Sequence, residues 1–167
     1  MKILMVCLGN ICRSPMAHGL MQHKIDNHPV NGRPLKWEVD SAGTSNWHEG
    51  SPPDARSISC MNRHGIDISN QTSRPVLLED LEEFDLIFVM DKANLADVMT
   101  MANTEEQQNK VKLILSMVYE QTPIDVPDPY FGVGDKGFEN VYKMLDEATD
   151  KIMEKYAAVN SPGNGKG

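Results

Sequence analysis

A short loop between an apolar run and the start of a helix constrains the fold more than any other stretch of this sequence. Ile3–Val6 is short and apolar throughout, which is typical of a buried strand. Ser14 is a common helix N-cap residue and Pro15 suits a first helical turn, so we expect a helix over residues 15–25. The loop Cys7–Arg13 therefore joins a strand to a helix N-terminus, where backbone amides and the helix dipole favour a bound anion.

The same loop combines a potential nucleophile with groups that bind phosphate. The guanidinium of Arg13 can donate two parallel hydrogen bonds to a phosphate. Cys7 lies in the same positive field, which favours a thiolate. Gly9 and Asn10 tolerate the left-handed backbone that a loop with inward amides requires. These residue types also fit a buried structural cysteine beside an ordinary turn, and the spacing alone does not separate the two interpretations.

Length and composition indicate one globular domain in a reducing compartment. A chain of 167 residues with 40% hydrophobic and 24% charged residues can bury its own core. The net charge of −8 argues against a nucleic acid or an anionic membrane as the main partner. We see no apolar stretch of about 20 residues, and the N-terminus enters a strand instead of a signal peptide. Three cysteines, an odd number, suit a reducing compartment, so we predict a cytoplasmic protein.

Strand and helix patterns alternate along the chain. Further strands are predicted at residues 37–41, 85–90 and 112–115, and further helices at residues 54–64, 77–83, 91–101 and 137–156. This alternation indicates a single α/β domain with a parallel sheet. We expect the domain to span residues 1–157, and residues 158–167, a polar tail with nothing to bury, to be disordered.

The remaining histidines and cysteine do not suggest a metal site. His18, His23 and His28 lack Cys or His partners at a convincing ligand spacing, so we expect them at solvated positions. Cys60 falls within a predicted helix and is expected to be a small apolar core residue.

The stretch Val6–Pro15 resembles the phosphate-binding loop of the low-molecular-weight protein tyrosine phosphatases. The likeness continues through Asp40–Thr44, Met90–Asp91 and Asp128–Tyr130, in the same order, and covers residues 1 to about 156. It implies a three-layer domain whose four-stranded parallel sheet has the strand order 2-1-3-4, with helices on both faces.

The resemblance also implies a reaction, in which phosphotyrosine proteins or small aryl phosphates are hydrolysed through a phosphocysteine. Cys7 would attack phosphorus, Ser14 would stabilise its thiolate, and Asp128 would protonate the leaving oxygen and then activate water. The Asp128-Pro129 sequence by itself favours a turn, and it is the matching order relative to Cys7 that favours the acid. No metal or other cofactor is needed. The phosphate oxygens would be held by the loop residues Leu8, Gly9, Asn10, Ile11, Cys12 and Arg13.

Further roles follow from the resemblance. Asn10 and Ser41 would hold the shape of the loop. Asp91 is expected first as a helix N-cap and second as a link to the site. Whether Asn70 supports the loop, as a histidine near this position does in some relatives, is left open. Trp47 either forms a wall of the substrate pocket or packs its loop onto the domain. The other expected pocket residues are Tyr130 and Phe131.

Two other functions share these features. An arsenate reductase on the same fold also uses a Cys-x5-Arg loop, but it needs a further thiol relay, for which Cys60 is the remaining candidate. A binding module that holds phosphate without catalysis would not need Cys7 and Asp128 together. Finally, Cys7 and Cys12 lie five residues apart in one tight loop. We expect peroxide to oxidise Cys7 to a sulfenic acid, which Cys12 then captures as a disulfide.

Overall fold

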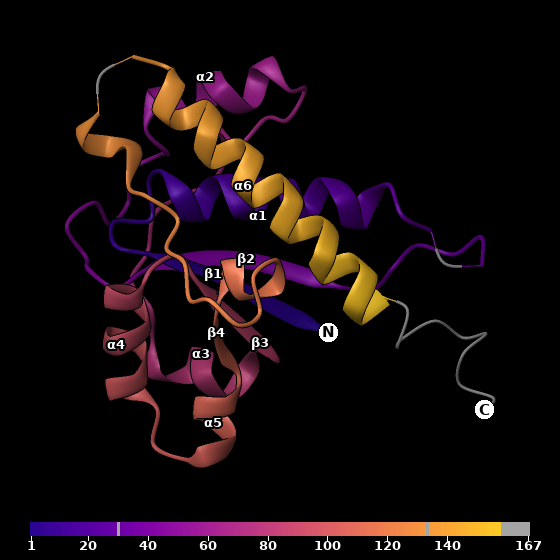
Figure 1. The fold of residues 1–167 in the computed structure, drawn as a ribbon, viewed down its shortest axis with the longest axis vertical. Helices are drawn as coiled ribbons and strands as arrows, with labels where there is room; N and C mark the ends of the chain where they lie inside the picture. Colours follow the sequence, from indigo (N-terminus) through magenta and orange to yellow (C-terminus); the bar gives the residue numbers. More distant parts are fainter. Residues whose placement is uncertain (30, 133, 158–167) are drawn as a thin grey trace.

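A four-stranded parallel sheet forms the centre of the protein (Figure 1). The computed structural model describes residues 1–29, 31–132 and 134–157, and the predicted tail 158–167 lies outside these residues. The strand order β2-β1-β3-β4 confirms the predicted topology. The strands are β1 Lys2–Cys7, β2 Glu38–Gly43, β3 Leu86–Val89 and β4 Val111–Leu113.

Helices cover both faces of this sheet, which confirms the three-layer arrangement (Figure 1). One face carries α1 Arg13–Asp26, α2 Ala55–Arg63 and α6 Lys136–Ile152. The opposite face carries α3 Leu78–Glu83, α4 Lys92–Met101 and α5 Glu105–Asn109. Because α1 packs on β1, β2 and α6 together, it fixes the strand–loop–helix segment at the middle of the sheet.

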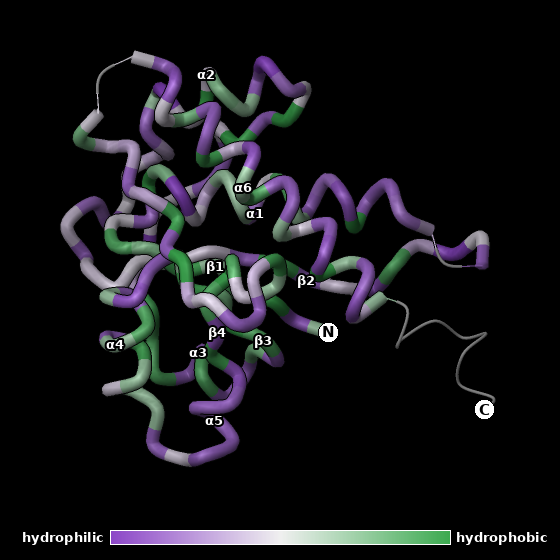
Figure 2. Tube along the Cα trace, viewed as in Figure 1, coloured by the Kyte–Doolittle hydropathy of each residue, from purple (hydrophilic) through white to green (hydrophobic). Residues whose placement is uncertain are grey.

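Side chains of β1 alternate between two cores, as expected of a strand buried on both faces. Ile3, Met5 and Cys7 join the cluster under α1 and α6. Leu4 and Val6 join the cluster under α3 and α4. In Figure 2 the hydrophobic residues are concentrated along these strands, and the hydrophilic residues line the outer loops. The central position of β1 therefore makes the backbone at Cys7 rigid.

The register of the sheet brings three chain segments to one edge. Cys7 lies opposite Gly43 of β2, and Val6 lies opposite Val89 of β3. Parallel strands present their carboxyl ends at the same edge, where open α/β sheets bind ligands. The segments that follow Cys7, Gly43 and Val89 therefore meet at this edge.

Several predicted boundaries are wrong. Helix α1 begins at Arg13, so Cys12 and not Ser14 is its N-cap residue. Strand β4 ends at Leu113 and a 3₁₀ helix, Ile114–Met117, follows it. Both residues 114 and 115 are buried, so the apolar run continues past the end of the strand. Helix α5 was not predicted, and α6 ends at Ile152 before the π-helical turn Met153–Ala157.

None of the helices within the described ranges is long and apolar enough to cross a membrane.

Candidate active site

The loop after β1 is held by hydrogen bonds to its carbonyl groups. The backbone N–H of Thr44 donates to Cys7 O (2.9 Å), and the N–H of Asp54 donates to Ile11 O (2.8 Å). Leu8 O accepts from both the N–H and the hydroxyl of Ser45, at 3.0 and 2.9 Å. In a trans peptide the N–H points opposite to the carbonyl. These carbonyls point outward to their donors, so the amides that follow them point into the loop.

Asn10 ties the loop to the first turn of α1, to β2 and to the backbone at Arg74. Its φ of 56° places it in the left-handed region, where asparagine is one of the few tolerated non-glycine residues. Its side-chain oxygen, Oδ1, accepts from the backbone N–H of Arg74 (3.1 Å). Its amide nitrogen donates to Ser14 Oγ (2.8 Å) and to Ser41 Oγ (3.0 Å). The support predicted for Asn10 and Ser41 thus corresponds to direct contacts between buried side chains.

The thiol of Cys7 lies beside the hydroxyl of Ser14, with 3.1 Å between Sγ and Oγ. Ser14 Oγ accepts a hydrogen bond from Asn10, so its own proton can be donated to the sulfur; the Ala42 carbonyl, 3.5 Å away, is the more distant acceptor. Ser14 is fully buried and lies in the first turn of α1, directly after Arg13. Its side chain therefore faces Cys7 and does not cap the helix.

Gly43 is required at this point because the loop packs against it. A Cβ atom at Gly43 would lie 2.8 Å from Leu8 O and 3.2 Å from Asn10 Cβ. Its backbone N–H donates to Arg74 O and its carbonyl accepts from the N–H of Val76, both at 2.8 Å. Any larger residue would push the loop away from β2.

Arg13 is 2% exposed, and its guanidinium is fixed from one side. Nη1 donates to Asp91 Oδ2 (2.7 Å) and to the carbonyl of Val126 (2.9 Å). Nη2 lies 3.6 Å from Asp128 Oδ2, close enough for an ion pair but not for a hydrogen bond. The donors on Nε and Nη2 can therefore fork onto a phosphate while Nη1 keeps the plane of the guanidinium in place.

Charges around Arg13 keep it protonated. Burial opposes the positive charge, but the neighbouring Cys7, Asp91 and Asp128 together raise the pKa of Arg13 above its usual value. The arginine is thus a permanent cation at the base of the loop.

Asp91 has both of the roles predicted for it. One carboxylate oxygen caps α4 by accepting from the N–H of Asn94 (2.8 Å). The other accepts from Arg13. The end of β3 is thereby tied to the phosphate loop.

Asp128 lies at the rim of a pocket whose floor is the loop. Its Oδ1 accepts from the N–H of Tyr130 (3.0 Å), which caps a 3₁₀ turn over Pro129–Phe131, while Oδ2 faces Arg13. The side chain is 28% exposed, so it reaches both the pocket and solvent. The pocket is lined by Cys7, Leu8, Gly9, Ile11, Cys12, Arg13, Trp47, His48, Asp128, Tyr130 and Phe131.

Aromatic side chains form the walls of this pocket. Trp47 and Phe131 are 72% and 80% exposed, so neither is buried in the domain core. Tyr130 packs edge-on against Phe131, with ring centroids 5.0 Å apart. Arg56 of α2 lies over the Tyr130 ring, with 5.4 Å between its guanidinium carbon and the ring centroid. Of the two alternatives for Trp47, lining the pocket is the one that the structure shows.

Cys12 also lines the pocket, but its sulfur is held as the protonated thiol. Burial, followed by the negative charge of Asp54, raises the pKa of Cys12 to about 12. The thiol of Cys12 is therefore protonated at neutral pH.

His18 corrects one prediction. It is partly buried, and its Nδ1 lies 3.2 Å from Ser41 Oγ. Burial lowers the pKa of His18, and the charge of Asp40 offsets this only in part, so the ring is neutral and Nδ1 can accept from Ser41. His23 and His28 are exposed, as predicted. Asn70 is exposed and makes no hydrogen bond to the loop within the described part of the chain.

Several residues that shape the site were not predicted. Ser73 donates its hydroxyl proton to Gly9 O (3.1 Å), and Gln71 donates to Pro15 O (3.0 Å). Arg74 pairs with Asp40 and Asp80, which fixes the backbone N–H that binds Asn10. These residues lie more than 50 positions from the loop, so no local pattern in the sequence connects them to it.

The sequence of this chain is similar to those of low molecular weight phosphotyrosine protein phosphatases. A profile described as low molecular weight phosphotyrosine protein phosphatase matches residues 2–161. The low molecular weight phosphotyrosine protein phosphatase of Gallus gallus is 38% identical over 155 residues, covering 92% of this chain and 94% of its own. The Homo sapiens protein of the same name is 39% identical with the same coverage.

The fold is also similar to that of a solved protein tyrosine phosphatase. The crystal structure of a protein tyrosine phosphatase from Entamoeba histolytica superimposes with a TM-score of 0.86 at 36% identity. The match covers 96% of this chain and 99% of that one.

Proposed function

The chain belongs to the low molecular weight phosphotyrosine protein phosphatase family, and from this premise we propose how its residues hydrolyse phosphotyrosine. The family and the structural relatives identify a cysteine-dependent tyrosine phosphatase, and they do not favour the arsenate reductase alternative. The third cysteine that such a reductase would use, Cys60, donates to Glu139 on α6.

The nucleophile is Cys7. Its sulfur attacks phosphorus on the side opposite the tyrosyl oxygen, so that an S–P bond forms as the P–O bond to the phenol breaks. The Ser14 hydroxyl, 3.1 Å from the sulfur, donates to the thiolate and lowers the free energy of its negative charge. Asn10 fixes the Ser14 oxygen and thereby the direction of this donation.

The three non-bridging oxygens are held by the loop. Inward amides from Leu8 to Arg13 and the free edge of the Arg13 guanidinium surround the site where they would lie. These donors are fixed before substrate binds, so stabilising the transferring phosphoryl group requires little reorganisation. The cation also offsets locally the repulsion that a chain of net charge −8 exerts on a phosphate.

Asp128 acts first as acid and then as base. Its protonated carboxyl gives a proton to the leaving phenolic oxygen. In the second step the carboxylate takes a proton from water, the water oxygen bonds to phosphorus, and the S–P bond breaks to return the Cys7 thiolate and release inorganic phosphate. Each turnover therefore consumes one water, and this route uses no metal.

The observation that carries this proposal is the convergence of three groups on one pocket. Cys7 and Arg13 lie at the two ends of the phosphate loop and Asp128 comes from a distant segment, yet all three line the same pocket, with Ser14 hydrogen-bonded to Cys7. The aromatic walls formed by Trp47 and Tyr130 suit a phenyl ring. We propose a cytoplasmic location, since a reducing compartment keeps Cys7 available as a thiolate.

The substitution Asp128→Asn tests the acid. The phenol of tyrosine, with a pKa of about 10, needs a proton to depart, whereas the more acidic p-nitrophenol departs partly unaided. The variant should therefore slow release of the leaving group more for phosphotyrosine than for p-nitrophenyl phosphate. Single-turnover measurement of leaving-group release isolates this step from hydrolysis of the phosphocysteine.

The matched control is Asp125→Asn. Asp125 lies three residues earlier and accepts hydrogen bonds from the backbone and side chain of Lys92. The Asp125→Asn variant should release the leaving group of both substrates at nearly the wild-type rate. If Asp128→Asn slows both substrates equally, Asp128 is a turn residue and the acid lies elsewhere.

Oxidation of Cys7 by peroxide is expected to be reversible. Peroxide converts the Cys7 thiolate to a sulfenic acid; the sulfur of Cys12 then displaces hydroxide, which leaves as water with the Cys12 proton, and a disulfide remains. After prolonged exposure to peroxide, dithiothreitol should restore activity to the wild type but far less to Cys12→Ser, in which oxidation of Cys7 can proceed further. Equal recovery of the two proteins would exclude Cys12 as the resolving cysteine.

A further inference from the structure

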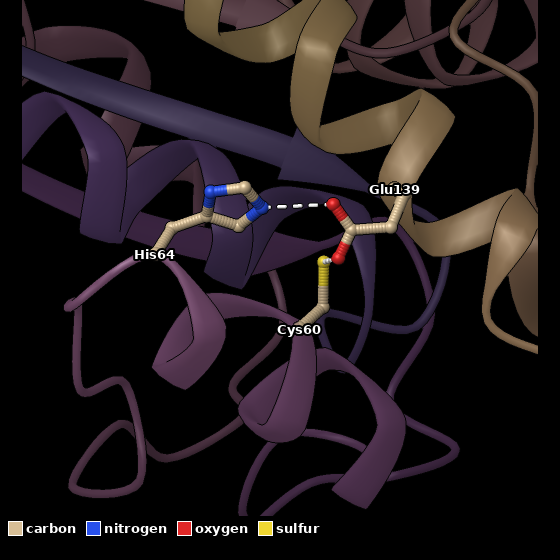
Figure 3. Close-up of side chains that lie close together, drawn as sticks. All are labelled: Cys60, His64 and Glu139. Carbon is tan, nitrogen blue, oxygen red and sulfur yellow. Dashed lines mark hydrogen bonds and ion pairs between the residues drawn. The ribbon is translucent and has the colours of Figure 1, made fainter.

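A second group of reactive side chains lies between α2 and α6, apart from the residues that line the pocket (Figure 3). Cys60 belongs to α2 and His64 is its C-terminal cap residue, so the two lie about one helical turn apart. Glu139 lies in the first turn of α6. We call these three residues the α2–α6 cluster.

The ligand atoms of the α2–α6 cluster face one another. His64 Nε2 lies 2.8 Å from Glu139 Oε1, and Cys60 Sγ lies 3.3 Å from Glu139 Oε2. The sulfur, the nitrogen and a carboxylate oxygen all lie within 4.8 Å of one another. Figure 3 shows both helices directing these side chains toward the same point.

We propose that the α2–α6 cluster binds one Zn²⁺ ion through Cys60, His64 and Glu139. Zinc accepts sulfur, imidazole and carboxylate ligands together, usually four in a tetrahedron. With zinc bonds of about 2.0–2.3 Å, the edges of that tetrahedron are roughly 3.3–3.7 Å long. The contacts of His64 and Cys60 with the two oxygens of Glu139, at 2.8 and 3.3 Å, and the 4.8 Å limit on the three ligand atoms lie on either side of these edges, so side-chain movements of an ångström or so, about the spread of these distances, suffice. Water supplies the fourth ligand, since His64 and Glu139 are partly exposed.

Neighbouring residues orient two of the ligands. The Tyr142 ring stacks on His64, with centroids 3.6 Å apart and planes 8° apart, which fixes the imidazole plane. Arg63 donates twice to Glu139 Oε2, at 3.0 and 2.8 Å, so that Oε1 is the oxygen directed at His64. Partners of this kind hold ligands in place at protein metal sites.

Zinc binding requires that Cys60 lose its proton. The S–H bond breaks, an S–Zn bond forms, and the proton passes to solvent. The hydrogen bond from Cys60 to Glu139 is given up at the same time. The thiolate and the carboxylate then neutralise the metal charge, and Arg63 keeps its contact with the second carboxylate oxygen. Without metal, the same residues form a hydrogen-bonded ion-pair group, so the helices stay in contact in both states.

The position of the α2–α6 cluster gives the metal a structural role. α2 also carries Arg56, which lies over Tyr130 of the pocket wall and over Phe138 of α6. A metal bridge between α2 and α6 would stiffen the support of this wall without touching the reacting atoms.

The sequence did not predict this site because its ligands are far apart in the chain. Glu139 lies 79 residues after Cys60 and 75 after His64. The local Cys-x3-His pattern supplies only two of the four ligands that a tetrahedral zinc site needs.

Titration with Co²⁺ tests the site, because cobalt replaces zinc and gives an ultraviolet charge-transfer band when a thiolate binds it. The double variant Cys7→Ser/Cys12→Ser leaves Cys60 as the one thiol among the three cysteines of the chain. We expect the band to appear and to saturate at one cobalt per chain, and zinc to abolish it by displacement. No band, or a band that zinc leaves unchanged, would overturn the proposal.

Further variants in this background assign the ligands. His64→Gln and Glu139→Gln should each weaken cobalt binding at least tenfold, whereas His23→Gln, at an exposed position on α1, should not. A band that persists unchanged in His64→Gln contradicts the site. If the double variant fails to fold, zinc binding can be measured on wild-type protein alkylated at Cys7 with iodoacetamide. Equilibrium dialysis against Zn²⁺ then gives the number of zinc ions bound per chain. One zinc per chain in the wild type and none in His64→Gln supports the site, and equal binding overturns it.

Discussion

Cys7→Ser should abolish turnover of phosphotyrosine, with a fall of at least about a thousandfold in kcat. The loop amides, Arg13 and the hydrogen bonds to Asn10 remain, so binding of phosphate or vanadate should persist. A serine hydroxyl in this position has no base to remove its proton. The measurement combines steady-state kinetics with a titration of vanadate binding.

Cys60→Ser is the matched control for this substitution. Cys60 is also a buried cysteine, but it belongs to α2 and donates to Glu139. Cys60 is not among the residues that line the pocket, so in metal-free buffer, where the proposed zinc site is empty, the control should keep turnover close to that of the wild type. Turnover of Cys7→Ser within tenfold of wild type would exclude Cys7 as the nucleophile.

Arg13→Lys should lower kcat by about a hundredfold or more and weaken vanadate binding as well. Lysine keeps the charge, but a single ammonium cannot hold Asp91 and the Val126 carbonyl while also donating two parallel hydrogen bonds to phosphate. Loss of this contact misplaces the remaining donors. The measurement is kcat and the vanadate Kd of each protein.

Arg33→Lys provides the control, since Arg33 is exposed and lies in the connection between α1 and β2. This variant should match the wild type in both kcat and Kd. A mild effect of Arg13→Lys on both quantities would mean that Arg13 supports the fold and does not hold the phosphate.

The parallel α/β architecture and the floor of the pocket could be predicted from local residue patterns, whereas the strand order followed from the resemblance to the family. Ile3–Val6 is apolar throughout, and Gly9 and Asn10 mark the turn that follows. Asp54 and Asp91 cap the helices predicted from them. Where an apolar run crosses a boundary, the pattern fails: residues 114–115 are as buried as β4 but belong to a 3₁₀ helix. Helix α5 has one buried residue, Gln107, and so no apolar stripe that could have predicted it.

The environment of individual polar residues could not be predicted in the same way. Ser14 is a common N-cap residue, but here the tertiary position of Cys7 decides what its hydroxyl binds. A histidine beside the apolar stripe of α1 can equally face solvent, yet here the face that carries His18 packs on β2 and brings the ring to Ser41. Ser73 and Arg74 reach the loop only because the chain returns beside Gly43. Each of these contacts depends on the packing of segments that are distant in sequence.

The most direct test of the account is to trap the phosphorylated enzyme. Wild-type protein and Asp128→Asn are mixed with p-nitrophenyl phosphate and quenched within the first turnover, and the site of the phosphoryl group is located by peptide mass spectrometry. We predict one phosphoryl group per chain on the sulfur of Cys7, accumulating more in Asp128→Asn because the variant lacks the base that activates water. A phosphoryl group on another residue, or none in either protein while p-nitrophenol is released, would contradict the account.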